Sequence, residues 1–236
     1  MKTLGIDTTT KNGGVILGSE GVKLGVRALG NPREYSDQII PAIENLLTQN
    51  QLRLQEIELI AVANGPGGFT GVRVGLAVAK AITQSLKIPS IGISTLEALA
   101  YKSRSSASTS LIAPMIDAQR GQVYTAIYQF NGHESTLITP EVLVVPEVWL
   151  GSLPKSPPPI FVGTGTVPYR EDIANFFSEA QVGSPDDCIL DALLRLANRK
   201  SSKAATATEL VANYIRPSDA EADSTARSSA TMKYED

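Results

Sequence analysis

The stretch from Ile57 to Leu86 constrains the fold more than any other part of the chain. It opens with a nearly all-apolar run over Ile57–Ala63, as expected for a strand that is buried on both faces of a parallel sheet. A glycine-rich turn, N-G-P-G-G-F-T-G, then leads directly into a helix predicted over Gly71–Leu86. A buried strand, a glycine turn and a helix in this order predict an α/β fold.

The glycine turn invites two interpretations, a phosphate loop or a tight strand-to-helix connection. A Walker loop requires Lys and Ser or Thr after its last glycine, and neither follows Gly71. The dinucleotide fingerprint also fails, because Thr70 stands where that motif has a glycine after Gly65 and Gly67. Pro66 removes one amide from a possible phosphate cradle. The residues therefore favour a tight turn, with phosphate binding as the alternative.

The predicted helix carries a ridge of small residues at a spacing of four, formed by Gly71, Gly75, Ala79 and Thr83. Small residues at this spacing allow another backbone to approach closely. The ridge either packs on the sheet of its own chain or meets another subunit, and we favour the second interpretation. Arg73, in the first helical turn, is a candidate to pair with an acid or an anion.

The first half of the chain predicts the element order β-β-β-α-β-α-β-α. Three short strands reach Leu29, and a helix over Ser36–Gln49 follows, with Ile39 and Ile43 on its apolar face. A short buried strand, Ser90–Ile93, precedes the capping box Ser94-Thr95-Leu96-Glu97, which starts a third helix.

The second half begins like the first. A strand over Leu111–Ile116 ends in Asp117, as the first strand of the chain ends in Asp7, and both lead into a meander. This pattern indicates an internal duplication. The run Ser184-Pro185-Asp186-Asp187 predicts a helix start in this half. The serine-rich linker Lys102–Ser110 divides the chain into an N-terminal lobe of residues 1–104 and a C-terminal lobe of residues 105–217, and residues 218–236 are predicted to be disordered.

Composition excludes several classes of protein. One histidine and one cysteine rule out zinc or iron sites built on those ligands, so no metal site is predicted. The histidine, His133, sits in a turn-like N-G-H-E context, so no catalytic triad is assigned. A net charge of −3 does not favour broad binding to nucleic acid. The chain shows neither a signal peptide nor an apolar run of membrane-spanning length, so we expect a cytoplasmic location without membrane contact.

The run Asp7-Thr8-Thr9-Thr10 is the only candidate for cofactor binding. A carboxylate followed by hydroxyls between two strands suits a magnesium-bound phosphate. A second turn of the same kind is then expected after Asp117, but it reads D-A-Q-R-G and lacks the small residues that let phosphates approach the backbone. An actin-like small-molecule kinase or ATPase remains the alternative function.

Several motifs together resemble one family. They are L-G-I-D-T-T-T near the N-terminus, N-G-P-G-G-F-T-G-V-R-V-G-L-A-V-A-K-A, S-T-L-E-A-L-A, M-I-D-A-Q-R-G-Q-V-Y and Y-I-R-P near the end. They occur in the order found in the TsaB (YeaZ) family and extend from residue 4 to about 217. One departure is Tyr35-Ser36, where many relatives have His-Ser.

The resemblance implies a fold like that of actin, Hsp70 and the sugar kinases (ASKHA), with two duplicated β-β-β-α-β-α lobes. It implies a non-catalytic accessory subunit of the bacterial complex that transfers threonylcarbamoyl to the adenosine beside the anticodon of tRNAs reading ANN codons. It also implies a heterodimer with the catalytic TsaD subunit and an assembly with the ATPase TsaE. ATP and metal are then expected in those partners, tRNA is expected only through the complex, and M22-peptidase labels imply no protease.

For this role the sequence predicts a partner interface on the first and second helices. The predicted contact residues are Ile39, Ile43, Gly71, Arg73, Gly75, Ala79 and Thr83. The same exposed face suggests a homodimer when the partner is absent.

Overall fold

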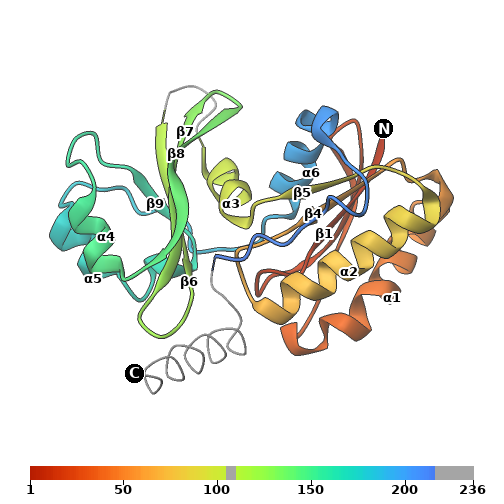
Figure 1. Ribbon diagram of the computed structural model, residues 1–236, viewed down its shortest axis with the longest axis horizontal. Coiled ribbons are helices and arrows are strands. Elements are labelled where there is room, and N and C mark those ends of the chain that lie inside the picture. The colour runs from red at the N-terminus through yellow and green to blue at the C-terminus, as the bar shows by residue number, and fades with distance from the viewer. Residues whose placement is uncertain (105–109, 216–236) are drawn as a thin grey trace, which may run out of the picture.

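The computed structural model describes residues 1–104 and 110–215 (Figure 1). The predicted disordered tail and the middle of the predicted linker lie outside these residues. No helix within the two described ranges has the length and apolar character needed to cross a membrane.

A five-stranded sheet in the order β3-β2-β1-β4-β5 organises the first lobe. Its first three strands form an antiparallel meander, and β4 and β5 then run parallel to β1. The strands are β1 (Lys2–Asp7), β2 (Gly14–Ser19), β3 (Val22–Ala28), β4 (Leu59–Ala63) and β5 (Ser90–Ile93). The predicted element order of the first half is confirmed.

Helices cover both faces of this sheet, because successive strand residues point to opposite sides. Leu4, Ile6 and Ile60 pack under α1 (Tyr35–Gln49) and α2 (Phe69–Leu86). Leu59 and Ala61 pack on the opposite side, under α3 (Thr95–Ser103) and α6 (Leu190–Arg199). The two helix layers are therefore separated by the full thickness of the sheet (Figure 1).

The second sheet repeats this topology with four strands in the order β8-β7-β6-β9. Its meander is again antiparallel, and β9 is parallel to β6 as β4 is to β1. The elements are β6 (Ser110–Asp117), β7 (Val123–Asn131), β8 (Glu134–Val144), α4 (Pro146–Ser152), β9 (Ile160–Val162) and α5 (Arg170–Phe176). The prediction of a two-lobed α/β fold with duplicated β-β-β-α-β-α lobes is confirmed.

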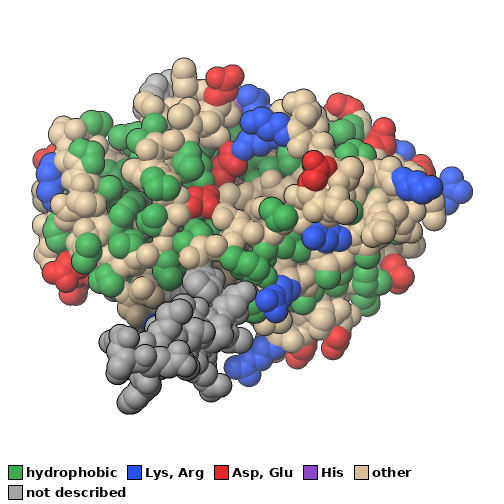
Figure 2. Space-filling view, in the orientation of Figure 1, with side chains coloured by type: hydrophobic (Ala, Val, Ile, Leu, Met, Phe, Trp, Pro, Cys, Tyr) green, Lys and Arg blue, Asp and Glu red, His purple; other side chains and the backbone are tan. Residues whose placement is uncertain are grey.

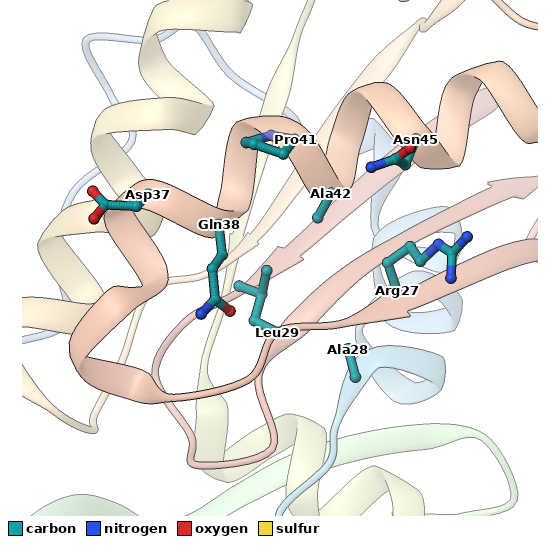
Figure 3. A pocket seen from close by; sticks show the side chains of 8 residues that line it. All are labelled: Arg27, Ala28, Leu29, Asp37, Gln38, Pro41, Ala42 and Asn45. Carbon is teal, nitrogen blue, oxygen red and sulfur yellow. The ribbon is translucent and has the colours of Figure 1, made fainter.

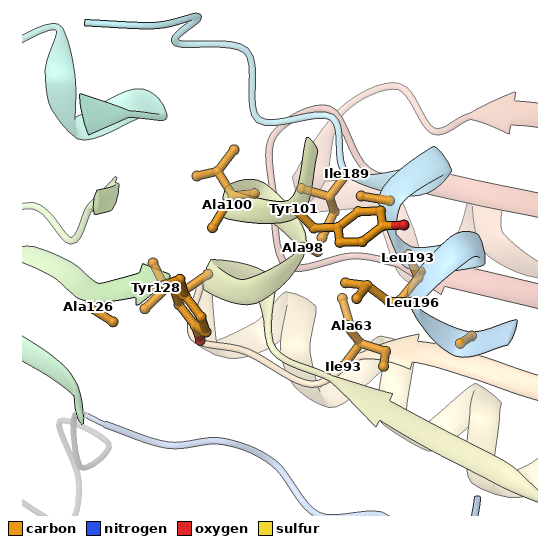
Figure 4. Packing of buried hydrophobic residues seen from close by; sticks show 14 of the residues in the cluster. Ala63, Ile93, Ala98, Ala100, Tyr101, Ala126, Tyr128, Ile189, Leu193 and Leu196 are labelled. Carbon is orange, nitrogen blue, oxygen red and sulfur yellow. The ribbon is translucent and has the colours of Figure 1, made fainter. Parts of the chain in front are cut away.

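Helix α3 joins the two lobes into one continuous core. Ser94 caps it as predicted, with its side chain accepting a hydrogen bond from the Glu97 backbone N–H. Every residue from Thr95 to Tyr101 is buried. Figure 4 shows α3 lying between Tyr128 of the second sheet and Ile93 of the first, within a single apolar cluster. A shared core of this kind couples the lobes mechanically.

The helix predicted to start at Ser184 begins instead at Leu190. The two aspartates expected in its first turn form hydrogen bonds with other groups instead. Asp186 accepts hydrogen bonds from the Cys188 backbone N–H and from the Lys102 side chain of α3. Asp187 accepts hydrogen bonds from the first lobe, from the Lys11 backbone N–H at 3.1 Å and the Asn12 side-chain amide at 2.7 Å. Tertiary partners have therefore replaced the local helix start.

The chain returns to the first lobe after α5. Although α6 falls within the predicted C-terminal lobe of residues 105–217, it packs against β1 and β2. Beyond it, Ala205 exchanges two backbone hydrogen bonds with Ser90 at the edge strand β5. The first lobe is thus completed by residues that follow the second lobe in sequence.

Candidate functional site

A cleft of about 1350 Å³ lies between the lobes. It is lined by the turn after β1, the glycine loop before α2, the turn after β6 and the C-terminal segment. The weak cofactor candidates Thr8, Thr9 and Thr10 line it, and Asp117 faces it from the other lobe. The fold thus brings together the two turns that the sequence predicted to correspond.

Asp7 is fully buried beneath this cleft, and its own turn satisfies it. One carboxylate oxygen accepts hydrogen bonds from the Thr9 backbone N–H at 2.8 Å and the Thr9 hydroxyl at 2.7 Å. The other accepts from the Thr10 hydroxyl at 2.7 Å. Burial raises the pKa of Asp7, and the threonine hydrogen bonds oppose that rise. The carboxylate organises the turn and directs no free oxygen to the cleft.

The second turn is built differently. Asp117 accepts hydrogen bonds from the backbone N–H and the side-chain amide of Gln119, at 2.9 and 3.2 Å. Gln119, Arg120 and Gly121 all have positive φ angles. Two of the three carry long side chains, in contrast to the threonines of the turn after β1. This turn lacks the run of small residues that the turn after β1 has, so the two turns differ in how closely a ligand could approach the backbone.

The glycine loop also packs against its own chain, on the turn after β1. The Gly68 backbone N–H donates to the Thr9 carbonyl at 3.2 Å, so this amide is not directed at the cleft. An added Cβ at Gly67 would lie 2.5 Å from that same carbonyl oxygen. The glycine is therefore required for close packing on the turn after β1, which supports the tight-turn interpretation.

The small-residue ridge of α2 also faces its own chain, contrary to our preferred interpretation. An added Cβ at Gly71 would lie 1.9 Å from the Thr8 carbonyl oxygen, and one at Gly75 would lie 2.4 Å from the Thr8 hydroxyl. The Thr8 hydroxyl donates to the Gly71 carbonyl at 2.6 Å. Ala79 and Thr83 continue the ridge and are buried. The small residues let the turn after β1 and the sheet approach α2.

The remaining predicted interface residues divide between core and surface. Ile39 and Ile43 are buried beneath α1 and are not available to a partner. Arg73 is exposed, and its Nε donates to the Tyr214 hydroxyl at 3.0 Å while its guanidinium lies 3.8 Å from the centre of the Phe69 ring. Inside the chain it contacts the aromatic pair Phe69 and Tyr214, where the sequence suggested an acid or an anion.

Another side of α1 and α2 is exposed to solvent. Exposed residues of α2 recur at helical spacing and include Ala77 and Ala81, with Val74 and Val78 half-buried beside them. On α1, Gln38 and Pro41 line a groove of about 460 Å³ beside β3 (Figure 3). The α1–α2 face is defined here as Ile40, Arg73, Val74, Ala77, Val78 and Ala81. Ile40 is 46% exposed and lies on the side of α1 opposite Gln38, away from the groove beside β3.

Two residues that shape the cleft were not predicted. The hydroxyl of Tyr35, at the start of α1, bonds to the Thr10 and Lys11 carbonyls at 3.0 and 2.9 Å, and accepts from the Gly13 N–H. Burial raises the pKa of Tyr35. Asp187 holds the same turn from the segment before α6. Nothing local in the sequence marks either role, because each contact joins distant segments.

Glu141 on β8 was also missed, and it ties three segments together. It accepts hydrogen bonds from the hydroxyls of Ser94 and Tyr128 and from the side-chain amide of Asn213. The Asn213 backbone N–H donates to the Asn64 carbonyl at 2.8 Å, just before the glycine loop. Burial, together with the charge of Glu141, raises the pKa of Tyr128. This carboxylate fixes the C-terminal segment across both lobes.

His133 lies in a turn between β7 and β8, outside the lining of the cleft, and contacts Arg104. Within the described ranges, no group of three or more His, Cys, Asp and Glu side chains is placed to hold a metal ion.

Comparisons with known proteins point to one pathway. Residues 29–218 match the family model described as TsaD, tRNA N6-adenosine threonylcarbamoyltransferase. The tRNA threonylcarbamoyladenosine biosynthesis protein TsaB of Bacillus subtilis (strain 168) is 33% identical over 229 residues, covering 94% of this chain and 97% of that protein. A tRNA N6-adenosine threonylcarbamoyltransferase of Protochlamydia amoebophila is 48% identical over 69 residues, which are 29% of this chain and 20% of that relative. YeaZ from Pseudomonas aeruginosa superposes with a TM-score of 0.76 at 25% identity, covering 90% of this chain and 99% of that structure.

Proposed function

Because the chain belongs to the TsaB family of tRNA threonylcarbamoyladenosine biosynthesis proteins, we propose that it acts there as a non-catalytic scaffold for a TsaD-type transferase. The resemblance predicted from the motifs is confirmed, as is the accessory role in this tRNA modification pathway. Two further points are proposed here. This chain catalyses no step of the reaction, and one particular surface of it binds the transferase.

The commitment of the cleft turn to internal bonds supports a non-catalytic role. All three threonine hydroxyls after Asp7 are engaged, with Gly71, Asp7 or Thr95. A nucleotide-hydrolysing site needs polar groups that meet a phosphate or a metal ion rather than each other. We assign ATP and metal to the partner subunits, a TsaD-type transferase and a TsaE-type ATPase, in a cytoplasmic complex.

The α1–α2 face is the docking surface that we propose for the transferase. It combines exposed alanines, half-buried valines, Ile40 and a fixed arginine, a composition suited to close helix packing. The same face offers a homodimer contact when the transferase is absent. The predicted helices are thus retained, whereas the predicted contact residues are replaced by those on their outer side.

Co-elution with the cognate TsaD-type subunit tests this proposal. Ala77→Glu places a charge in the middle of the face, where burial without a partner is unfavourable, and we expect at least about tenfold weaker binding. Ala174→Glu, on the exposed side of α5, is the matched control. Equal co-elution of both variants would show that the transferase docks elsewhere. Reconstituted tRNA modification with and without this chain tests the accessory role itself.

An actin-like small-molecule kinase or ATPase is the alternative, and the size of the cleft is the observation in its favour. It requires the isolated chain to bind ATP with magnesium. Calorimetry on the purified chain decides between the two functions, since micromolar affinity together with turnover would replace the scaffold proposal.

A further inference from the structure

Positive charge gathers on the side of the first lobe opposite the α1–α2 face. Four cations form the basic patch, Arg104 after α3, Arg195 and Arg199 on α6, and Lys203 just beyond it. The sequence has no Asp or Glu between Ala192 and Thr208, although the whole chain has a net charge of −3. Figure 2 shows Lys and Arg side chains at the upper edge of the molecule, between α3 and α6, with acidic side chains beside them.

The three arginines of the basic patch are near enough for their charges to act on one another. Burial lowers the pKa of Arg104, and the charges of Arg195 and Arg199 lower it further. The charge of Arg104 in turn lowers the pKa of His133. Across the two described ranges, none of the four cations forms an ion pair. By contrast, the neighbouring Lys200 is neutralised by Glu97.

The position of Arg104 is fixed by the fold. Its guanidinium lies 3.5 Å from the centre of the Tyr101 ring and donates to the Tyr101 carbonyl and to His133 Nδ1. Its Nε is buried and has no hydrogen-bond partner. A positive charge is thus held rigidly at the base of the patch, while Arg195, Arg199 and Lys203 are exposed above it.

Stabilisation of the α6 C-terminus explains only part of this arrangement. Cations favour the negative end of a helix dipole, which accounts for Arg199 and Lys203. It does not account for Arg195, a full turn earlier, or for Arg104, which comes from another element and is repelled by the arginines of α6. Like charges held together without counter-ions on a folded surface indicate a site for a polyanion.

We propose that the basic patch binds the phosphate backbone of the tRNA on which the complex acts. This inference rests on the proposed function, which places the chain beside a tRNA-modifying subunit. Arg195 and Arg199 are one turn apart on a single exposed stripe of α6, so both can reach consecutive phosphates. Because the sheet separates this side from the α1–α2 face, the chain can hold the transferase and the RNA together. The contacts are electrostatic and read no base sequence.

Fluorescence anisotropy with an unmodified tRNA transcript tests the patch, using the full chain both alone and with its TsaD-type partner, across a salt series. The double variant Arg195→Gln/Arg199→Gln should weaken RNA binding by about tenfold or more. It should also reduce the slope of log affinity against log salt by roughly 1.4 to 1.8, the loss of two phosphate contacts. The matched control Arg53→Gln/Arg170→Gln removes two exposed arginines that are not part of the patch and should change neither quantity.

Co-elution of each variant with the transferase, measured without RNA, separates the two proposals. If the wild-type complex forms but the patch variant and the control bind RNA equally, the patch proposal is overturned and the scaffold proposal stands. If the wild-type complex forms and binds no RNA, the patch proposal is also overturned. If the patch variant loses the transferase instead of the RNA, the patch is a protein contact and the RNA assignment is wrong. Failure of the wild-type chain to bind the transferase would instead count against the scaffold.

Discussion

Replacing Gly75 with alanine tests whether the ridge of α2 packs against its own chain. The new Cβ would lie 2.4 Å from the Thr8 hydroxyl, and its other near neighbours, on Val62 and Ile6, would be at 3.5 and 3.7 Å. Only the hydroxyl is too close, so it must move and give up its 2.6 Å hydrogen bond to Gly71. Overpacking costs about 1–3 kcal/mol and a lost hydrogen bond about 0.5–1.5 kcal/mol.

A gain in helix propensity of about 1 kcal/mol opposes this loss. We therefore expect Gly75→Ala to lower the free energy of unfolding by about 2 kcal/mol, measured by urea denaturation followed by circular dichroism. In a Thr8→Ala background the obstructing hydroxyl is absent, so the same substitution should become neutral or stabilising. The coupling energy between the two positions should be about 2–3 kcal/mol.

Ala77→Gly, on the exposed side of the same helix, calibrates the propensity effect and should lose about 1 kcal/mol. Equal stabilisation of the protein by Gly75→Ala with and without the Thr8 hydroxyl would contradict internal packing of the ridge. Such a result would mean that the ridge has free space beside it, as an interface for another subunit would.

Three further predictions concern the turn after β1 and the buried tyrosines. Tyr35→Phe removes a hydroxyl that serves Gly13 and two carbonyls, and should lower the free energy of unfolding by about 1–3 kcal/mol in urea denaturation. Asp7→Asn should change that free energy by no more than about 1 kcal/mol and leave reconstituted tRNA modification intact, because the carboxylate only organises its turn; loss of modification in a well-folded variant would assign Asp7 to the chemistry. Burial raises the pKa values of Tyr35 and Tyr128 above 10.0, so their stabilising contribution is complete below pH 10.0 and declines as the pH rises further. Urea denaturation at increasing alkaline pH should show this decline, about 1.4 kcal/mol per pH unit for each group, and constant stability would contradict it.

Much of the fold follows from local patterns. The alternation in β1 to β3, the continuous apolar run of β4 and the capping box before α3 all correspond to the observed elements. The matching positions of Asp7 and Asp117 predicted the duplication, because each carboxylate closes the first strand of a meander. These features depend on the conformational preferences of neighbouring residues, which agree here with the overall fold.

The candidate site was harder to predict, because its contacts join distant segments. A ridge of small residues predicts that another segment packs closely against the helix, but it does not identify that segment. The group that approaches α2 is Thr8, 63 positions before Gly71, and it lies at the end of β1, which pairs with β4. The roles of Tyr35, Asp187 and Glu141 have the same origin, since each satisfies polar groups from another part of the chain.

The sequence by itself determined the family and the order of elements, because motif spacing and local residue preferences do not depend on the rest of the fold. Only the tertiary structure decided which side of α2 is buried, that α6 completes the first lobe, and that Arg104 stands beside Arg195 and Arg199. Burial of a helix side and clustering of charge depend on the surfaces that the whole chain brings together. The tertiary structure therefore moved the proposed docking surface from the inner ridge of α2 to its outer side.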